Sequence, residues 1–441
     1  MYTSYIGKKF LQLYNDRKST HLTAQEFFEN LFFELFFNHD RHLMHVGNSP
    51  FFQKPKPKDV ETHGSKALAQ LNNLTKKMQS GVYSGAIYVG FAAEGTQATT
   101  SGQLTDLDFG IDPEEMYASW LGQALGIGVS GGFVMLIDQP EVLWGLYEGW
   151  AYYRQYLEHT PNVKDKQIET WNGYWLRHYF GKRYNPAFPD EGLQIDTKEV
   201  VGKMAIPTSE WVKIIFALAN KYSKQQITAY AYNLSQTNTT LGFINLFLPE
   251  IRTMYELRDA VFLKKEDVIL KDKEIEDLQT FFNFKNACKL GVIGLKALEP
   301  DKLRTYMPKG SVEYAGGKDF SFKDETSYFN YKLYKLWITA MLNKLELLEL
   351  ASQLATTLTE IENDKQNHDR GKTITSNLVK EIRESEKLGH FIEGLTKVME
   401  QFTVSMDLKG LLTEVLALPS DQFPLFITLL RFDYQYQKSQ Q

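Results

Sequence analysis

The sequence predicts a predominantly helical α+β protein, in which a mixed N-terminal domain with a small sheet precedes a C-terminal helical bundle. Short apolar runs at residues 86–89 and 133–137, bounded by glycine and polar residues, are typical of strands. From Asp324 onward, four amphipathic stretches are joined by short connections, which is the pattern of a bundle. We therefore expect four regions: a mixed α/β domain at 1–160, a mainly helical region at 161–298, a linker or arm at 299–323, and the bundle at 324–441.

In the first region, local signals mark where helices begin. Thr23 and Glu26 form a capping box ahead of an apolar helix that reaches Phe37. Asp112, followed by proline and two acids, is a helix start in which negative charge meets the positive end of the helix dipole. Two further helices are expected over residues 65–79 and 140–158.

Beyond residue 160, helical periodicity dominates the sequence. In the middle region, helices are expected at 168–179, 209–222 and 241–262. In the bundle, they are expected at 327–362, 376–401, 408–416 and 422–433.

Composition limits the class of protein. The chain has 441 residues, of which 43% are hydrophobic and 23% charged, so it is not disordered as a whole. Its single cysteine, Cys288, excludes an intrachain disulfide, a cysteine-ligated zinc site and an iron–sulfur cluster. This cysteine usage suits a reducing compartment, and no signal peptide is visible, so we expect a cytoplasmic protein.

One uncharged window, residues 116–137, is long enough to cross a bilayer. Five glycines interrupt it, so we expect a helix, a turn and a strand rather than a membrane span. The same glycines match G-x-G-x-x-G at 126–131 and G-x-S-x-G at 128–132. Both motifs need a strand before the turn and a helix after it, whereas the order here is reversed. We therefore expect a turn and no cofactor.

Two clusters could indicate catalysis or metal binding. Acids between Asp106 and Glu115 could form a divalent-metal nuclease site, but helix capping explains most of them. His39, His42 and His45 could meet one metal ion if they lay on a continuous helix; they could equally face water or phosphate. We assign no catalytic residue and no metal ligand, and we leave metal binding by the histidines open.

Three segments have residue compositions that are typical of nucleic-acid contacts. An extended Lys-Pro tract presents Lys54, Lys56 and Lys58. Residues 171–184 interleave aromatic rings with cations, which suits base stacking and phosphate neutralisation, although an amphipathic helix would explain the same pattern. A short polar loop carries carboxamides that could read base edges, or it is an ordinary turn. The candidate residues of the last two segments are Trp175, Arg177, Tyr179, Lys182, Arg183, Gln236 and Asn238.

The order of these features resembles the large subunit of type I CRISPR-associated interference complexes (Cascade), particularly type I-B. The resemblance lies in the Tyr5-Ile6-Gly7 start, the Gly-rich region at 83–103, the unit WLGQALGIGVSGGFVMLIDQPEVLW at 120–144, and the helical C-terminal part. The chain is shorter than many members and lacks the cysteine clusters that some of them carry. The likeness is spread over the chain and includes no single diagnostic motif.

The resemblance implies a non-catalytic subunit of a guide RNA complex. Such a subunit recognises the motif beside the DNA target, stabilises the opened strands and docks a helicase-nuclease. Its partners would be the other subunits, guide RNA, target DNA and that helicase-nuclease, with no membrane contact. Two alternatives stay open: a metal-dependent nuclease or hydrolase that uses the acids and histidines above, and a protein-binding helical scaffold.

Overall fold

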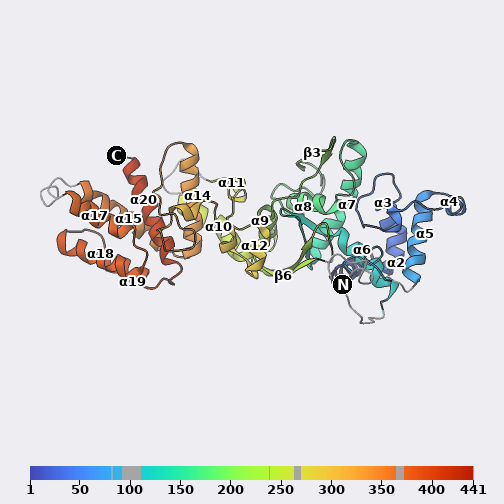
Figure 1. Ribbon diagram of the computed structural model, residues 1–441, viewed down its shortest axis with the longest axis horizontal. Helices are drawn as coiled ribbons and strands as arrows, with labels where there is room; N and C mark the ends of the chain where they lie inside the picture. Colours follow the sequence, from blue (N-terminus) through green and yellow to red (C-terminus); the bar gives the residue numbers. More distant parts are fainter. Residues whose placement is uncertain (81–82, 92–110, 238, 263–269, 364–371, 441) are drawn as a thin grey trace. The chain divides into compact units, whose positions relative to one another are not determined.

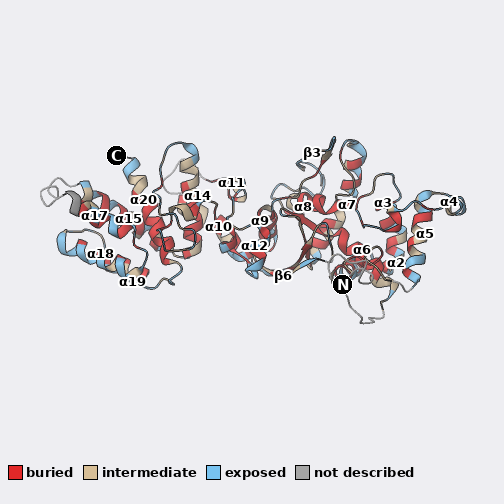
Figure 2. Ribbon diagram, viewed as in Figure 1, coloured by how far each residue is buried: buried red, intermediate tan, exposed pale blue. Residues whose placement is uncertain are grey.

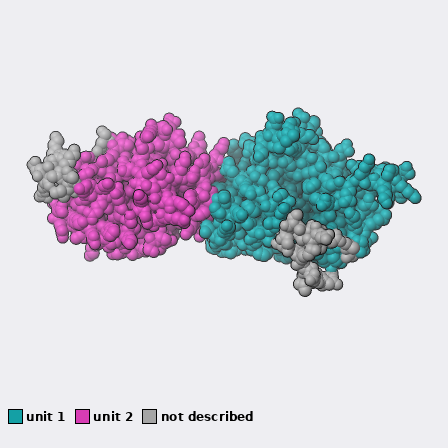
Figure 3. Space-filling model, viewed as in Figure 1, with its two compact units in different colours: residues 1–249, 283–293 teal, residues 250–282, 294–441 magenta. Residues whose placement is uncertain are grey.

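The computed structural model describes residues 1–80, 83–91, 111–237, 239–262, 270–363 and 372–440, with the side chains of 372–374 excepted. These residues form two compact units (Figures 1 and 3). Unit 1 consists of residues 1–249 and 283–293, and unit 2 of residues 250–282 and 294–441. The predicted fold class is confirmed: helices predominate and a small mixed sheet is present.

Unit 1 contains most of the strands and a surrounding set of helices. Its helices are α1 (Tyr2–Lys18), α2 (Ala24–Phe27), the π-helix η1 (Phe28–Phe32), α3 (Phe33–Phe36), the 3-10 helix η2 (Pro50–Phe52), α4 (Pro57–His63), α5 (Lys66–Gln79), α6 (Pro113–Ala124), α7 (Pro140–His159), α8 (Ile168–Tyr179), α9 (Trp211–Lys221) and α12 (Phe284–Lys289). The Thr23 capping box and the Asp112 cap form as predicted.

The main sheet has the strand order β1-β2-β5-β6-β7. Its strands are β1 (Ile127–Val129), β2 (Phe133–Ile137), β5 (Gln226–Asn233), β6 (Thr240–Phe247) and β7 (Val292–Ile293). All neighbours are antiparallel except β6 and β7. A separate ribbon pairs β3 (Lys198–Val200) with β4 (Lys203–Ala205). The glycine motif at 126–132 is thus part of the β1–β2 hairpin, so a strand that was not expected precedes the turn, and a second strand rather than a helix follows it.

Two expectations about strands and helices in unit 1 are wrong. Residues 86–89 form a turn in which the Tyr88 amide donates to the Ser84 carbonyl at 2.9 Å. The predicted helix at 241–262 is divided, because its first part is β6 and only α10 (Leu248–Phe262) is helical. A short apolar run fits either structure, and pairing with β5 decides the outcome here. The middle region is therefore less helical than expected, and residues 161–249 belong to the same unit as residues 1–160.

Unit 2 is built from helices around a buried C-terminal helix. Its elements are the greater part of α10, α11 (Asp272–Glu276), the 3-10 helix η3 (Leu295–Leu298), α13 (Leu303–Tyr306), α14 (Glu325–Leu342), α15 (Leu345–Asn363), α17 (Lys372–Arg383), α18 (Leu388–Gln401), α19 (Leu408–Leu416) and α20 (Phe423–Ser439). Residues 423–434 of α20 are buried, and α20 packs against α14, α15 and α17. Buried residues occupy the interior of each unit (Figure 2).

Two predicted helices of unit 2 are broken in the structure. The stretch 327–362 divides at Asn343, which adopts a left-handed conformation with φ of 50°. Asparagine tolerates this conformation and commonly ends a helix in this way. The stretch 376–401 divides between α17 and α18.

Residues 299–323, expected to be a linker or arm, pack within unit 2. Arg304 forms an ion pair with Glu299, with Nε and Oε1 2.7 Å apart. The buried Arg431 of α20 donates to the carbonyls of Gly317 and Lys318, both at 2.9 Å. These hydrogen bonds tie the segment to the core of the unit.

In the segments that the structure describes, no helix combines the length and the apolar character needed to cross a membrane.

The tightest helix contact in unit 1 is the crossing of α1 and α6, where two glycines let the backbones touch. A Cβ atom on Gly122 would lie 1.8 Å from the Thr3 carbonyl oxygen, and one on Gly7 would lie 1.8 Å from that of Ala118. Neither oxygen can move without shifting a whole helix. The crossing therefore requires residues without a side chain at both positions.

We expect Gly122→Ala to destabilise unit 1 by about 3 kcal/mol, because the added methyl group overpacks this crossing. In an open helix the same change would stabilise by up to about 1 kcal/mol through helix propensity. The control is Gly389→Ala in α18 of unit 2, where a Cβ would meet nothing within 4 Å; its unfolding is followed by far-UV circular dichroism, which detects helices of both units. Chemical denaturation followed by tryptophan fluorescence reports largely on unit 1, which holds all the tryptophans except Trp337. Equal stability of the Gly122 variant and the natural chain would show that α1 and α6 do not approach as closely at Gly122 as described.

Candidate nucleic-acid interface

A cavity of about 970 Å³ lies in unit 1 beside the start of α5, and we call it the basic cavity. Three lysines line it, Lys54, Lys66 and Lys166, together with a single acid, Asp40. The other lining residues are Phe37, Asn38, His39, His42, Phe51, Phe52, Gln53, Ser65, Ala67 and Gln70. Positive charge therefore outweighs negative charge around the opening.

Hydrogen bonds from two side chains hold the segment that forms one wall, which runs from the end of α3 to Lys54 and includes η2. Arg154 of α7 donates to the Leu35 carbonyl from Nε at 3.0 Å and from Nη2 at 2.7 Å, and to the Arg41 carbonyl at 2.8 Å. The Gln70 carboxamide of α5 donates to the carbonyls of Phe51 and Gln53 at 3.0 and 2.8 Å. The wall is thus fixed by side chains from two distant helices.

Lys166 reaches the basic cavity from the loop between α7 and α8. Its backbone has a φ of 64°, and its amide donates to the His42 carbonyl at 2.8 Å. Its ammonium lies over the Phe52 ring, 4.9 Å from the ring centre, and 3.4 Å from a carboxylate oxygen of Asp165. The aromatic ring and the backbone bond together hold this cation at the rim.

The histidines do not form a metal centre. Residues 38–45 are not helical, so the spacing that could have brought three imidazoles together does not operate. No group of three histidine, cysteine, aspartate or glutamate side chains suited to a metal occurs among the residues described. Burial, followed by the positive charge of Lys166, lowers the pKa of His42 to about 4, so this imidazole is neutral at pH 7.

A second cavity, of about 400 Å³, adjoins the basic cavity, and Lys166 lines both. We call it the polar cavity. Its lining residues are His45, Val46, Gly47, Gly85, Val89, Gln123, Lys166, Gln167, Glu169, Thr170, Leu234, Ser235 and Thr237. Lys54 of the lysine tract lines one cavity and Ser235 and Thr237 of the polar loop line the other, and Lys166 is common to both.

The polar cavity contains a buried carboxyl group. Glu169 of α8 is only 8% exposed, and its Oε1 accepts a hydrogen bond of 3.0 Å from Gln123 Nε2. Burial raises the pKa of Glu169 to about 7. The carboxamide oxygen of Gln123 is buried and has no hydrogen-bond partner among the described residues. The wall of the cavity thus holds one buried acceptor without a hydrogen-bond partner among the described residues and one group that titrates near neutrality.

The structure places the three predicted segments differently. Lys54, Lys56 and Lys58 are all exposed, and Lys54 lines the basic cavity. Because α4 begins at Pro57, the extended part of the tract is shorter than expected and Lys58 lies in the first turn of a helix.

The aromatic segment 171–184 does not line either cavity. The prediction that Trp175 stacks on bases is wrong. Its ring is fully buried, its indole N–H donates to the Gly145 carbonyl at 2.7 Å, and it packs where a Cβ on Gly149 would lie. Lys182 and Arg183 are exposed, whereas Tyr179 is half-buried.

The remaining candidates lie in segment 171–184 and in the polar loop. The guanidinium of Arg177, which is half-buried, lies over the Tyr174 ring at 5.3 Å. In the polar loop, Ser235 and Thr237 line the polar cavity. Gln236 is exposed and its Oε1 accepts from Thr239 Oγ1 at 3.2 Å. Asn238 lies outside the described residues.

The acids between Asp106 and Glu115 have structural roles where they are described. Asp112 caps α6 by accepting from the Glu114 amide at 3.0 Å. Glu114 accepts from the Ala24 amide at 2.6 Å at the start of α2, and Glu115 pairs with Lys8. Asp106 and Asp108 lie outside the described residues. The helix-capping interpretation is thus confirmed for Asp112.

Sequence reasoning missed Lys66, Lys166 and Glu169, which the fold brings to the two cavities. Comparison with known proteins adds no further assignment, because no family, curated protein or solved structure was found to match the chain. The function is therefore inferred from these residues and their geometry.

We expect Glu169→Gln to alter how the stability of unit 1 depends on pH. The pKa of Glu169 is about 7 in the folded chain against 4.5 for an exposed carboxyl. Between pH 4.5 and about pH 7 the folded state thus binds more protons than the unfolded state, so the natural chain loses stability as the pH rises through this range. Because glutamine stays neutral, the variant should gain up to about 3 kcal/mol relative to the natural chain between pH 4.5 and pH 8.

The measurement is urea unfolding of both proteins at pH 4.5 and pH 8, followed by tryptophan fluorescence. Glu61→Gln, on the exposed side of α4 in unit 1, is the control for the loss of a carboxylate that is not buried. A constant difference between the Glu169 variant and the natural chain would show that this carboxyl is not buried as described.

Proposed function

We propose that unit 1 binds nucleic acid along the joined basic and polar cavities. The observation that carries the proposal is Lys166, which lines both cavities and so joins the predicted lysine tract to the predicted polar loop. Lysines neutralise phosphate groups, and the hydroxyls and carboxamides beyond them can contact sugars and base edges.

The start of α5 strengthens the attraction for phosphate. Ser65 caps this helix and accepts a hydrogen bond from the Leu68 amide at 3.1 Å, and both Ser65 and Lys66 line the basic cavity. A helix N-terminus carries partial positive charge, which ordinarily disfavours a lysine in the first turn. A phosphate in the cavity would relieve this repulsion by interacting with the lysine and the helix dipole together.

Phe52 supplies an aromatic face beside these cations. Its ring is half-buried, with Lys166 over it and the His45 ring centred 4.4 Å away, so a base would stack here by displacing one of these two side chains. An aromatic ring next to a phosphate-binding cation is the combination that proteins use to hold unpaired nucleotides, because every base can stack on such a ring. This arrangement favours a strand with unstacked bases over an uninterrupted duplex.

We further propose that the chain acts as the non-catalytic large subunit of a CRISPR RNA-guided DNA surveillance complex. The sequence resemblance suggests this role, and the joined cavities support it because recognition of a flanking motif and of opened strands needs both phosphate and base contacts. Its partners would be the other subunits of the complex, the guide RNA, the target DNA and a helicase-nuclease.

Neutralising the cavity lysines should weaken binding to all DNA sequences alike. Lys54→Gln, Lys66→Gln and Lys166→Gln should each remove one phosphate interaction and so reduce the slope of log affinity against log salt by about 0.7 for a single strand. The measurement is fluorescence anisotropy of a labelled 20-nucleotide single strand with the full chain, at salt concentrations from about 50 to 200 mM.

Lys221→Gln and Lys224→Gln are the matched controls, because both lysines are exposed in unit 1 and line neither cavity. They should leave the slope nearly unchanged. An undiminished slope in all three cavity variants would place the nucleic acid elsewhere, and no binding at the lowest salt concentration would overturn the proposal for the isolated chain.

The polar loop should contribute sequence preference rather than general affinity. Gln236→Ala removes an uncharged group that can donate and accept, so it should cost about 1–3 kcal/mol on the preferred flanking sequence and much less on others. Asn238→Ala tests the same expectation at the position two residues on. The assembled complex is titrated with targets that differ only in the flanking base pairs, with the exposed Gln225→Ala as control. Equal losses on every target would assign the loop to positioning.

A further inference from the structure

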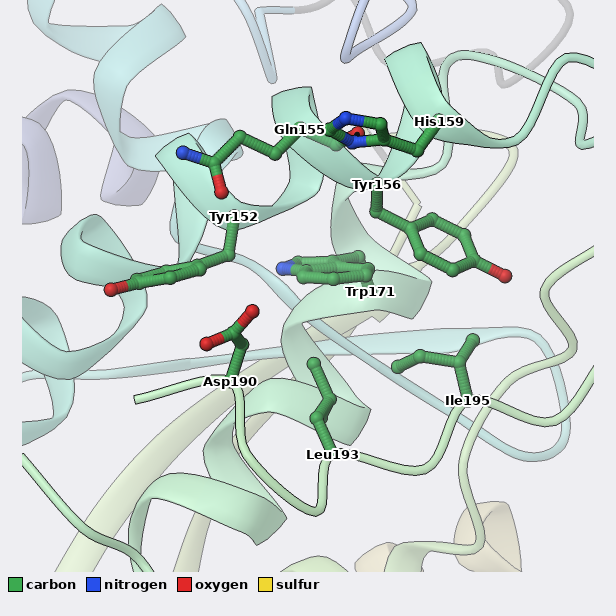
Figure 4. A pocket seen from close by; sticks show the side chains of 8 residues that line it. All are labelled: Tyr152, Gln155, Tyr156, His159, Trp171, Asp190, Leu193 and Ile195. Carbon is green, nitrogen blue, oxygen red and sulfur yellow. Dashed lines mark hydrogen bonds between the residues drawn. The ribbon is translucent and has the colours of Figure 1, made fainter. Parts of the chain in front are cut away.

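A groove rich in aromatic residues runs along α7 on the side of the segment 184–195. It consists of two adjoining cavities of about 410 and 500 Å³, both lined by Tyr152. Figure 4 shows the larger one, in which the carboxylate of Asp190 points toward the rings of Tyr152 and Trp171. Neither of these two cavities shares a lining residue with the basic or polar cavity.

In the smaller cavity, four tyrosine rings surround a carboxylate. Tyr147, Tyr152, Tyr179 and Tyr184 line it together with Glu148. The rings of Tyr179 and Tyr184 are 4.7 Å apart and inclined by 53°. The face of a tyrosine ring is electron-rich, so a cavity lined by several such rings and a carboxylate favours a cation.

The buried core fixes the orientation of Tyr152. Its ring is stacked on Trp175, with the ring centres 4.8 Å apart and the planes inclined by 17°. Trp175 is held in turn by its hydrogen bond to Gly145. Since one face of Tyr152 is covered by a rigid neighbour, the ring is organised before any ligand arrives.

The groove is negatively charged. Glu148 and Asp190 line it, and none of the described lysines or arginines does. Glu148 accepts a hydrogen bond of 2.8 Å from the Trp144 indole, which orients its carboxylate without neutralising it. Burial and the charge of Glu148 raise the pKa of Tyr184 to about 12, and burial and the charges of Asp190 and Glu148 raise the pKa of Tyr152. A phosphate would be repelled here.

We infer that this groove binds the guanidinium group of an arginine side chain from a partner protein. A guanidinium is planar and weakly hydrated, so it can stack on a tyrosine face while its N–H groups donate to a carboxylate. The four rings around Glu148 offer both interactions in one cavity. The inference does not depend on nucleic-acid binding by the basic and polar cavities.

The test uses the full chain and an acetylated peptide amide, Gly-Ser-Arg-Ser-Gly, titrated by saturation-transfer NMR. We expect saturable binding that weakens by about tenfold when citrulline, which is isosteric but neutral, replaces the arginine. Glu148→Gln should weaken binding of the arginine peptide to a similar extent. Glu158→Gln, on the same helix but outside both cavities, should not.

Two substitutions of Tyr184 distinguish the loss of its aromatic face from a general disturbance of the fold. Tyr184→Leu should weaken binding severalfold, whereas Tyr184→Phe, which keeps the aromatic face, should retain it. Equal affinity for the citrulline peptide, or no saturation at millimolar arginine peptide, would overturn the inference. So would binding of oligothymidylate that Tyr184→Leu abolishes, because the rings would then stack on bases.

Discussion

The arrangement of unit 1 depends on the guanidinium of Arg154. This side chain lies in the interior, only 6% exposed, and its hydrogen bonds go to the carbonyls of Leu35 and Arg41. Leu35 belongs to the last turn of α3, where carbonyls have no partner within the helix. A cation from α7 meets this need, and although its burial lowers its pKa to about 10, it stays charged at neutral pH.

This interaction shapes one of the two proposed surfaces, and the helix that supplies it lines the other. By fixing the chain after α3, Arg154 shapes the wall of the basic cavity, which Lys54 and Lys166 also line. The same helix, α7, presents Glu148 and Tyr152 to the aromatic groove. α7 thus supports the basic cavity through the buried Arg154 and lines the aromatic groove with Glu148 and Tyr152.

Local signals in the sequence were sufficient for elements whose ends are set by their own residues. The helix predicted at 168–179 is α8, and the one predicted at 408–416 is α19. Elements that depend on distant partners were not predictable in this way. β6 is a strand because β5 pairs with it, and residues 86–89 are a turn because neighbouring groups, such as Ser119 at 2.9 Å from the Val89 amide, satisfy their backbone.

The candidate site was predictable to the same limited degree, for the same reason. Lys54 stands next to Pro55 in an exposed tract that local sequence makes visible, and it lines the basic cavity. Lys166 has no comparable local pattern, since its place is set by a hydrogen bond to His42 across the fold. The aromatic segment 171–184 was ambiguous because core packing and base stacking select the same side chains.

The placement of Trp175 resolves that ambiguity in physical terms. A tryptophan contributes to binding only if a face of its ring is open, and here the ring is enclosed by the core and hydrogen-bonded to Gly145. Trp175 nevertheless affects the surface, because its fixed ring stacks on the more exposed Tyr152 and so fixes the orientation of that ring.

The distribution of charge along the sequence also matters for the aromatic groove. Residues 81–150 contain no lysine or arginine, so Glu148 can stand among tyrosines with no internal cation from that stretch to neutralise it.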